Sequence, residues 1–128
     1  YYIAAEIDIR NKRFDAASVN AKKAITILRE VGYLSGLMEA TLLMGIAKYN
    51  LQQLSEAHED LETAHEYYIS EGIYVHLRVR SLFYLEAVRI AMGNAHFSEF
   101  IEESFQIPYI DHFPEALAQI QALRSDRG

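Results

Sequence analysis

Residues 42–68 read LLMGIAKYNLQQLSEAHEDLETAHEYY and predict two amphipathic helices joined at a short turn. Apolar residues recur there at three- and four-residue steps, which is the spacing of one face of an α-helix. Gly45, Ala57 and Ala64 stand on these faces, where a small side chain lets two helices approach closely. The stretch contains no glycine-rich loop, no cysteine and no recognisable nucleophile. It is organised around packing helices together, and this decides the fold class.

The same periodicity runs along most of the chain and predicts an all-α fold without paired strands. Gly32 and Gly72 end two of the helices, because a left-handed residue after a helix is favourable mainly without a Cβ. Ser35 is expected to cap the helix that follows Gly32. Residues 106–114, QIPYIDHFP, form a loop, since each residue before a proline is pushed out of the α region. The predicted helices span residues 1–11, 14–31, 36–51, 54–71, 75–92, 95–105 and 114–124.

Composition narrows the class of protein further. The chain has 128 residues, of which 51% are hydrophobic, a formal net charge of −6 and no cysteine. The negative charge argues against direct binding of nucleic acid, which needs a basic face. The lack of cysteine excludes disulfides and thiolate metal sites and fits the reducing cytoplasm, where we expect the protein to reside. No apolar run reaches the roughly 18 residues of a membrane span and no signal peptide is visible, so no membrane partner is expected.

The chain repeats itself with a period of 40 residues. Gly32 and Gly72, which end two helices, are one period apart. A fixed period of this size with two helices in each period indicates an α-solenoid of stacked antiparallel helix hairpins. The other pairs with this spacing are Ala5 and Gly45, Phe14 and Leu54, Ala17 and Ala57, Ala21 and Leu61, and Ala24 and Ala64.

The second of these hairpins resembles the tetratricopeptide repeat (TPR) family. It carries the family's glycine at Gly45 and its two alanines at Ala57 and Ala64, with the family's spacing. It departs from the family at Thr41, where a large aromatic residue is usual, and at Ile69, where a proline is usual. Its period is also longer than the family's typical length of about 34 residues. The residues that stand at the positions of the family's pattern, matching or not, are Thr41, Met44, Gly45, Lys48 (beside Tyr49), Ala57, Leu61, Ala64 and Ile69.

The resemblance implies an array of about three TPR-like repeats followed by a capping helix. The third repeat follows the pattern most loosely, because Val88 and Phe97 would stretch the period to about 43 residues. Long repeats of this type look like those of bacterial regulators and signal-transducing ATPases. The resemblance therefore implies a non-catalytic protein–protein interaction module within a larger regulatory or signalling protein. The implied units are repeats at 1–32, 33–72 and 73–107, then a loop, capping helix and tail at 108–128.

In arrays of this family the first helix of each repeat lines a groove that binds a partner peptide or helix. Aromatic and aliphatic residues with a few charges suit an apolar helix or an extended peptide. Leu82 and Leu85 either line this groove or pack against the neighbouring helix, and packing is the favoured interpretation. Tyr2, Glu6 and Leu42 stand where chaperone-binding relatives carry Lys, Arg or Asn, so no chaperone tail is expected as a partner. The groove residues assigned by the resemblance and by helical spacing are Tyr2, Glu6, Ile9, Arg10, Glu39, Leu42, Ile46, Tyr49, Asn50, Arg89 and Met92.

Charge is unevenly distributed between two of the predicted helices. Residues 10–30 carry six basic and two acidic side chains, whereas residues 55–71 carry six acidic side chains and no Lys or Arg. As the second helices of successive repeats, they are expected to lie side by side and to pair across a solvated face. The alternative interpretation is a patch that steers a charged partner or another copy of the chain.

Candidate chemistry is sparse. His58, Glu62 and His65 share one helix face, which is a pattern that can bind zinc. The seven-residue step separates the two histidines by about 10 Å along the helix axis, too far for one ion. Exposed polar residues on an acidic helix explain the pattern better. No Ser-His-Asp order or pair of acids in an obvious cleft indicates an enzyme, so we expect no catalytic residue, metal or cofactor.

The amino-terminal stretch YYIAAEIDI is apolar, whereas the end of a solenoid is normally polar. Either the natural protein continues before Tyr1, which is not a methionine, or another chain covers this face. Tyr1, Tyr2, Ile3 and Ile7 are therefore candidates for self-association into a homo-oligomer. Two functional hypotheses remain open. The first is a module that binds a protein or peptide partner, and the second is a structural oligomerisation segment without a free groove.

Overall fold

The structure is a computed structural model that describes residues 1–72, 74–93 and 102–103. Within these ranges it contains five α-helices and no strand. Each helix predicted up to residue 92 is confirmed, with ends within two residues of the predicted ones. The helices predicted at 95–105 and 114–124, and the loop at 106–114, lie outside the described residues apart from Glu102 and Glu103. The helices are α1 (Tyr2–Arg10), α2 (Phe14–Val31), α3 (Leu34–Asn50), α4 (Leu54–Glu71) and α5 (Val75–Ala91).

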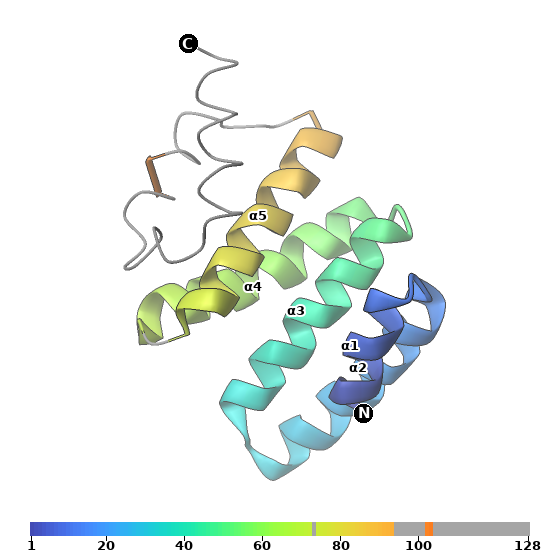
Figure 1. The fold of residues 1–128 in the computed structure, drawn as a ribbon. Helices are drawn as coiled ribbons and strands as arrows, with labels where there is room; N and C mark the ends of the chain where they lie inside the picture. Colours follow the sequence, from blue (N-terminus) through green and yellow to red (C-terminus); the bar gives the residue numbers. More distant parts are fainter. Residues whose placement is uncertain (73, 94–101, 104–128) are drawn as a thin grey trace.

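Neighbouring helices form an array of antiparallel hairpins (Figure 1). Each helix packs against the next one along the chain, and α3 at the centre contacts the other four. In Figure 1, α2 lies behind α1 and α4 lies behind α5, with α3 between the two pairs. The predicted all-α class with antiparallel helix hairpins is confirmed for the described residues.

The backbone repeats with the same 40-residue period as the sequence. Gly32 and Gly72 end α2 and α4 with φ angles of 74° and 71°. Lys12 and Gln52, in the turns within the two hairpins, are also left-handed, with φ angles of 60° and 64°. In both turns the amide of the next residue donates to the carbonyl five residues before it, at 2.7 and 2.9 Å. A left-handed residue together with this bond closes a helix end and reverses the chain.

Small side chains allow the helices of a hairpin to come close. Gly45 faces α4, because a Cβ built on it would lie 2.8 Å from the Cγ atom of Leu61. Ala57 and Ala64, on the opposing face of α4, are fully buried. The predicted role of all three residues in helix packing is confirmed.

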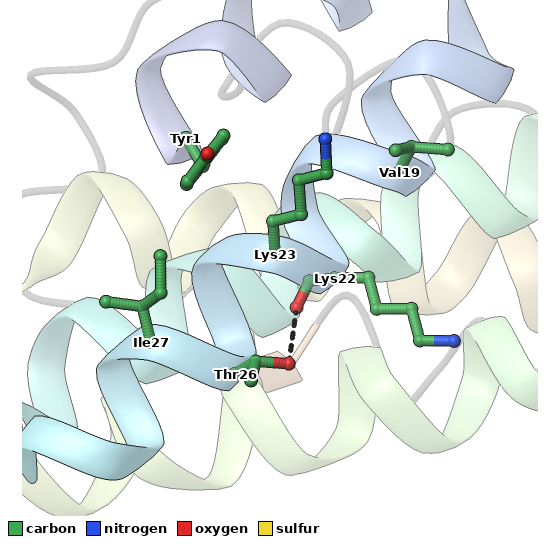
Figure 2. Close-up of a pocket in the computed structure, with 6 residues that line it drawn as sticks. All are labelled: Tyr1, Val19, Lys22, Lys23, Thr26 and Ile27. Atoms are coloured by element: carbon green, nitrogen blue, oxygen red, sulfur yellow. Dashed lines mark hydrogen bonds between the residues drawn. The ribbon is translucent and has the colours of Figure 1, made fainter.

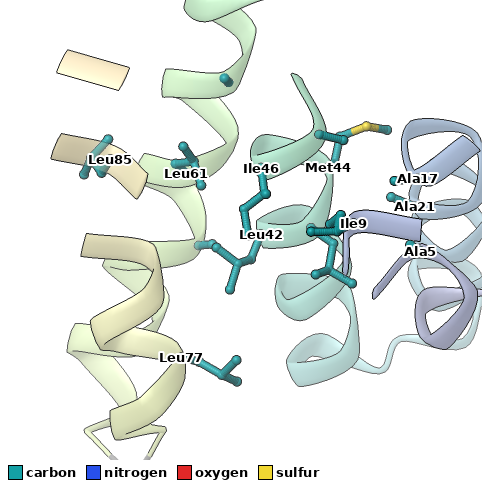
Figure 3. Packing of buried hydrophobic residues seen from close by; sticks show 14 of the residues in the cluster. Ala5, Ile9, Ala17, Ala21, Leu42, Met44, Ile46, Leu61, Leu77 and Leu85 are labelled. Carbon is teal, nitrogen blue, oxygen red and sulfur yellow. The ribbon is translucent and has the colours of Figure 1, made fainter. Parts of the chain in front are cut away.

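The core runs through the whole array, and it is formed mainly by α3 and the helices on either side of it. Leu42 and Ile46 project from α3 between Ile9 of α1 and the leucines of α5 (Figure 3). Alanines dominate the contact between the first two helices and large aliphatic residues dominate elsewhere. The most deeply buried members are Ala5, Ala17, Ala21, Leu42, Leu43, Ile46, Ala47, Ala57, Leu61, Ala64, Tyr68, Leu85 and Val88.

The predicted cap of α3 is wrong. The helix begins at Leu34, with Tyr33 as its N-cap residue, and no side chain caps it. Ser35 lies within the first turn instead. The reason is that Gly32 reverses the chain so sharply that the amide of Tyr33 still bonds to Leu28 of α2, at 3.1 Å. The next residue can then enter α3 directly, two positions earlier than the sequence pattern indicated.

Candidate interaction surfaces

The predicted groove is formed by α1, α3 and α5, but its central apolar residues are buried. Leu42 and Ile46 are both 0% exposed, so they present no surface to a partner in this conformation. The prediction that they line an open groove is therefore wrong, because α1 and α5 both pack against α3 and cover them. Ile9, which was assigned to the groove as well, is buried with them. Leu82 and Leu85 are buried too, as the packing interpretation predicts.

The remaining groove candidates keep some exposure but not as one open channel. Tyr2, Asn50 and Met92 are exposed, together with Arg10. Glu6, Glu39, Tyr49 and Arg89 are half-buried. Several of them already have partners within the chain. The Tyr49 ring packs edge-on against Tyr84 of α5, with centroids 6.1 Å apart, and Arg89 lies 3.9 Å from the Glu86 carboxylate.

A bidentate ion pair crosses the groove from α1 to α5. The two terminal nitrogens of Arg80 donate to the two carboxylate oxygens of Glu6, at 2.7 and 3.0 Å. This fork geometry is the strongest form of an arginine–carboxylate contact. The bond from Arg80 is the main reason that the pKa of Glu6 lies below its usual value. Sequence reasoning missed Arg80, because the two residues are 74 positions apart and share no periodic relation.

His65 is a second correction, because it is buried rather than exposed. Only 4% of it is accessible, and its Nδ1 atom lies 2.8 Å from the hydroxyl oxygen of Ser81. Its Nε2 atom lies 2.6 Å from a carboxylate oxygen of Glu103. The bond to His65 is the main cause of the lowered pKa of Glu103. The partners come from α5 and from residue 103, which the pattern of one helix face could not indicate.

The His65 cluster has the residue types of a nucleophilic triad but not its accessibility. Ser81 is 0% exposed, and its hydroxyl is also within 3.0 Å of the carbonyl oxygen of Arg78. A buried hydroxyl that is held by two polar neighbours has no room for a substrate carbonyl. The cluster instead ties α4 to α5 and to Glu103. Among the residues that the structure describes, no group of His, Asp or Glu is arranged to hold a metal ion.

An exposed apolar surface lies at the amino-terminal end, on α1 and α2. We call it the α1–α2 face and define it by Tyr1, Ile3, Ile7, Val19 and Ile27. Their exposed fractions are 60%, 63%, 49%, 54% and 45%. Three of the four self-association candidates belong to it, and the fourth, Tyr2, is exposed beside it. Sequence reasoning missed the two members on α2, Val19 and Ile27. Their position on the solvent side of the predicted helix could have indicated that they are exposed.

A shallow hollow of about 510 Å³ lies on this face, between Tyr1 and one side of α2 (Figure 2). Its apolar lining comes from Tyr1, Val19 and Ile27, and its basic border comes from Lys22 and Lys23. The Lys23 ammonium lies 5.5 Å from the centroid of the Tyr1 ring, within the range of a cation–π contact. The remaining lining residue, Thr26, donates its hydroxyl to the carbonyl oxygen of Lys22 at 3.1 Å.

The basic side of α2 and the acidic side of α4 do not pair. α3 is the main neighbour of each of these helices and lies between them. Among the described residues, no ion pair joins α2 to α4. The predicted side-by-side pairing is therefore wrong, and the two charged surfaces face solvent separately. The second interpretation, in which one of these surfaces steers a charged partner or another copy of the chain, stays a prediction.

No known protein family, curated protein or solved structure matches the chain. In the part of the chain that the structure describes, no helix is both long and apolar enough to cross a membrane.

Proposed function

We propose that this chain is a non-catalytic interaction module that binds a helix or peptide of a partner protein, within a larger regulatory or signalling protein. The observation that carries the proposal is the α1–α2 face, where five large apolar side chains are 45% to 63% exposed. Contiguous apolar surface on a helical domain is the usual mark of a protein–protein contact. The resemblance of the second hairpin to TPR repeats supports the same class of function, and the cysteine-free composition supports a cytoplasmic location.

The binding surface in this proposal differs from the groove that the sequence indicates. Leu42 and Ile46 are buried, and an ion pair of Glu6 with Arg80 joins α1 to α5. Ile3 and Ile7 remain available on α1, at 63% and 49% exposure. A partner can reach the α1–α2 face without any rearrangement of the array.

A selection from a displayed library of helical peptides tests this function. We expect enriched peptides to bind the whole chain and to lose binding to the Ile3→Lys, Ile7→Lys variant. The matched control is Glu59→Lys, Glu62→Lys, which changes two exposed residues on the outer side of α4 and should leave binding unchanged. Enrichment of no peptide, or equal binding to both variants, would argue against an interaction module that uses this face.

The second candidate function is structural self-association, and the same exposed isoleucines favour it. Burial of apolar surface from two copies of the face would drive association at about 25 cal/mol per Å² of apolar area. Light scattering over a wide concentration range separates the two functions. A dimer that Ile3→Lys, Ile7→Lys converts to a folded monomer indicates self-association, whereas a monomeric parent chain indicates a surface that is free for another protein.

A further inference from the structure

The α1–α2 face has the form of a surface that receives a helix. Leu43 and Ala47 on α3 are 2% and 0% exposed, and helical spacing places them on the same side as Met44. That side packs against α2, because the hydroxyl of Ser18 donates to the sulfur of Met44 at 3.6 Å. One period earlier, α1 carries an isoleucine at each of the two equivalent positions, and both are exposed. On α1, the positions equivalent to those with which α3 packs against a helix are therefore exposed.

The border of this surface is basic. Lys22 and Lys23 are exposed beside Val19 and Ile27, and neither lysine has an ion pair with a described residue. The nearest acidic groups on α1 are occupied, since Glu6 bonds to Arg80 and Asp8 bonds to Arg13 and Asn20. Acidic residues stand one period later on α4, at the positions equivalent to Val19, Lys22 and Thr26. The two outer helices therefore carry opposite charge at corresponding places.

The charge of the face indicates whether a second copy of the chain or another protein binds there. A second copy that docks through the same face would bring two further lysines and no acidic side chain of the face to one contact, and an excess of like charge at a contact is unfavourable. α4 of a second copy has the complementary charge, but its exposed side offers mainly glutamates and only Ile69 as a large exposed apolar residue. Of these two surfaces, both from the described part of the chain, neither matches both the apolar centre and the basic border.

We propose that the α1–α2 face binds an acidic amphipathic helix of another protein. Its apolar stripe packs on Ile3 and Ile7 of α1 and on Val19 and Ile27 beside the hollow of α2, and its Asp or Glu side chains meet Lys22 and Lys23. This inference rests on the proposed function and specifies the chemistry of the partner. The apolar stripe provides the buried area, and the lysines select for negative charge and orient the helix.

Two designed helical peptides of about 18 residues test the proposal, because this length gives about five turns of a continuous apolar stripe. Both carry the same leucine stripe, and the residues that flank it are glutamates in one peptide and lysines in the other. Fluorescence anisotropy with the full chain at low salt should show the glutamate peptide binding about tenfold more tightly. The preference should shrink as salt is added, because surface charges more than about 8 Å apart are screened at physiological ionic strength.

Charge reversal on the protein provides the matched control. Lys22→Glu, Lys23→Glu should abolish or invert the preference between the two peptides while the chain stays folded, as followed by circular dichroism. A second control compares two single variants, Lys12→Glu and Lys23→Glu, which change the net charge equally. Lys12 lies in the turn between α1 and α2 and not at the border of the face. The glutamate peptide should therefore bind the Lys12→Glu variant several-fold more tightly than the Lys23→Glu variant.

The outcomes separate the inference from the function on which it rests. Equal affinity for the two peptides, with both lost in Ile3→Lys, Ile7→Lys, overturns the acidic partner and leaves the interaction module intact. Failure of both peptides to bind a chain that the display selection shows to bind other helices overturns the proposed occupant. Failure of the peptides and of the selection together overturns both the inference and the function. A concentration-dependent dimer that the isoleucine variant dissociates makes a second copy the occupant.

Discussion

Gly45 is the residue on which the approach of α3 to α4 depends. A Cβ at this position would lie 2.8 and 2.9 Å from two carbons of Leu61 and 3.3 Å from the Cβ of Asp60. Real Cβ atoms do not reach the two shorter distances, so a larger side chain must push the two helices apart. Leu61 is fully buried and has little freedom to move away.

We expect Gly45→Ala to lower the free energy of unfolding by about 1–2 kcal/mol, because overpacking outweighs the helix propensity that alanine adds. Urea denaturation followed by circular dichroism measures this change. Gly36→Ala is the matched control in the same helix, since the added Cβ meets chiefly the ring of Tyr33, which is 58% exposed and can rotate away. An equal loss in both variants would contradict the role given to Leu61.

The sequence predicted well where small residues pack between helices, but it predicted poorly which polar residues are buried. Gly45 and the alanines of α4 could be recognised, because a small residue that recurs on an apolar helix face indicates close packing of a second helix. His65 was misplaced because its burial depends on Ser81 and Glu103, 16 and 38 positions away. Nothing within α4 itself distinguishes His65 from the more exposed His58.

At the scale of elements, a polar bridge joins the two helices of each of the first two hairpins at the same place. In the first hairpin the side-chain amide of Asn20 donates to Asp8 at 2.8 Å. In the second, one period later, Lys48 donates to Asp60 at 2.9 Å. Burial raises the pKa of Asp60 despite this bond, so the carboxylate is held in an environment that disfavours its charge.

Lys48→Met should therefore destabilise the second hairpin in a pH-dependent way. At pH 7 we expect a loss of about 1–2 kcal/mol in unfolding free energy, because the Asp60 carboxylate keeps its desolvation cost without its partner. A raised folded-state pKa means that stability is regained as the pH falls and Asp60 takes up a proton. Urea denaturation at pH 7 and at about pH 4.5 compares the two states, because the lower pH lies just above the ordinary pKa of an aspartate.

The double variant Lys48→Met, Asp60→Leu controls for the loss of the lysine itself. It removes the isolated carboxylate, so it should be more stable than the single variant at pH 7 and should not share its gain on acidification. If Lys48→Met loses the same unfolding free energy at both pH values, the charge of Asp60 does not cause the destabilisation.

The period predicted the elements reliably, because helix ends, left-handed turns and packing faces all recur after 40 residues. It could not predict the start of α3, where the backbone bond from Tyr33 to Leu28 takes the place of the expected cap. It also could not show which face of α1 stays bare, because exposure depends on what packs against a helix.

At the scale of the whole molecule, the pair formed by Glu6 and Arg80 joins the first helix to the last of the five. Both side chains are about one-quarter exposed, at 26% and 28%, so solvent weakens the pair but does not cancel it. The position of α5 over α3 could not be predicted from the sequence, since this contact spans 74 residues and falls outside the period. The burial of Leu42 and Ile46 could not be predicted for the same reason, because it depends on how α1 and α5 pack against α3.

We expect Arg80→Gln to lower the unfolding free energy by about 1 kcal/mol at pH 7, the upper range for a partly exposed pair. The pKa of Glu6 is lowered in the folded state, so this contribution is present above the unfolded pKa and is lost as the pH falls through the folded one. The difference from the parent chain should therefore fade below about pH 4, given the reference value for Glu. Urea denaturation across this pH range measures it.

Arg10→Gln is the matched control for the ion pair. Arg10 also approaches Glu6, but at 3.9 Å and with 76% of its side chain exposed, so its removal should change stability little. Hydrogen exchange should show faster opening of α1 amides in Arg80→Gln and not in Arg10→Gln. Equal effects of the two variants would mean that net charge, and not the link between α1 and α5, is responsible.

The two hairpin bridges also disfavour mispairing of helices between chains as they fold. Asp8 is matched to an amide and Lys48 to a carboxylate, at equivalent places in otherwise similar hairpins. A mispaired hairpin that sets α1 of one chain against α4 of another brings Asp8 opposite Asp60, which then lacks its partner Lys48. The complementary error leaves Lys48 opposite Asn20. The two bridges therefore favour the pairing of each helix with its own partner over pairing with a helix of the other hairpin.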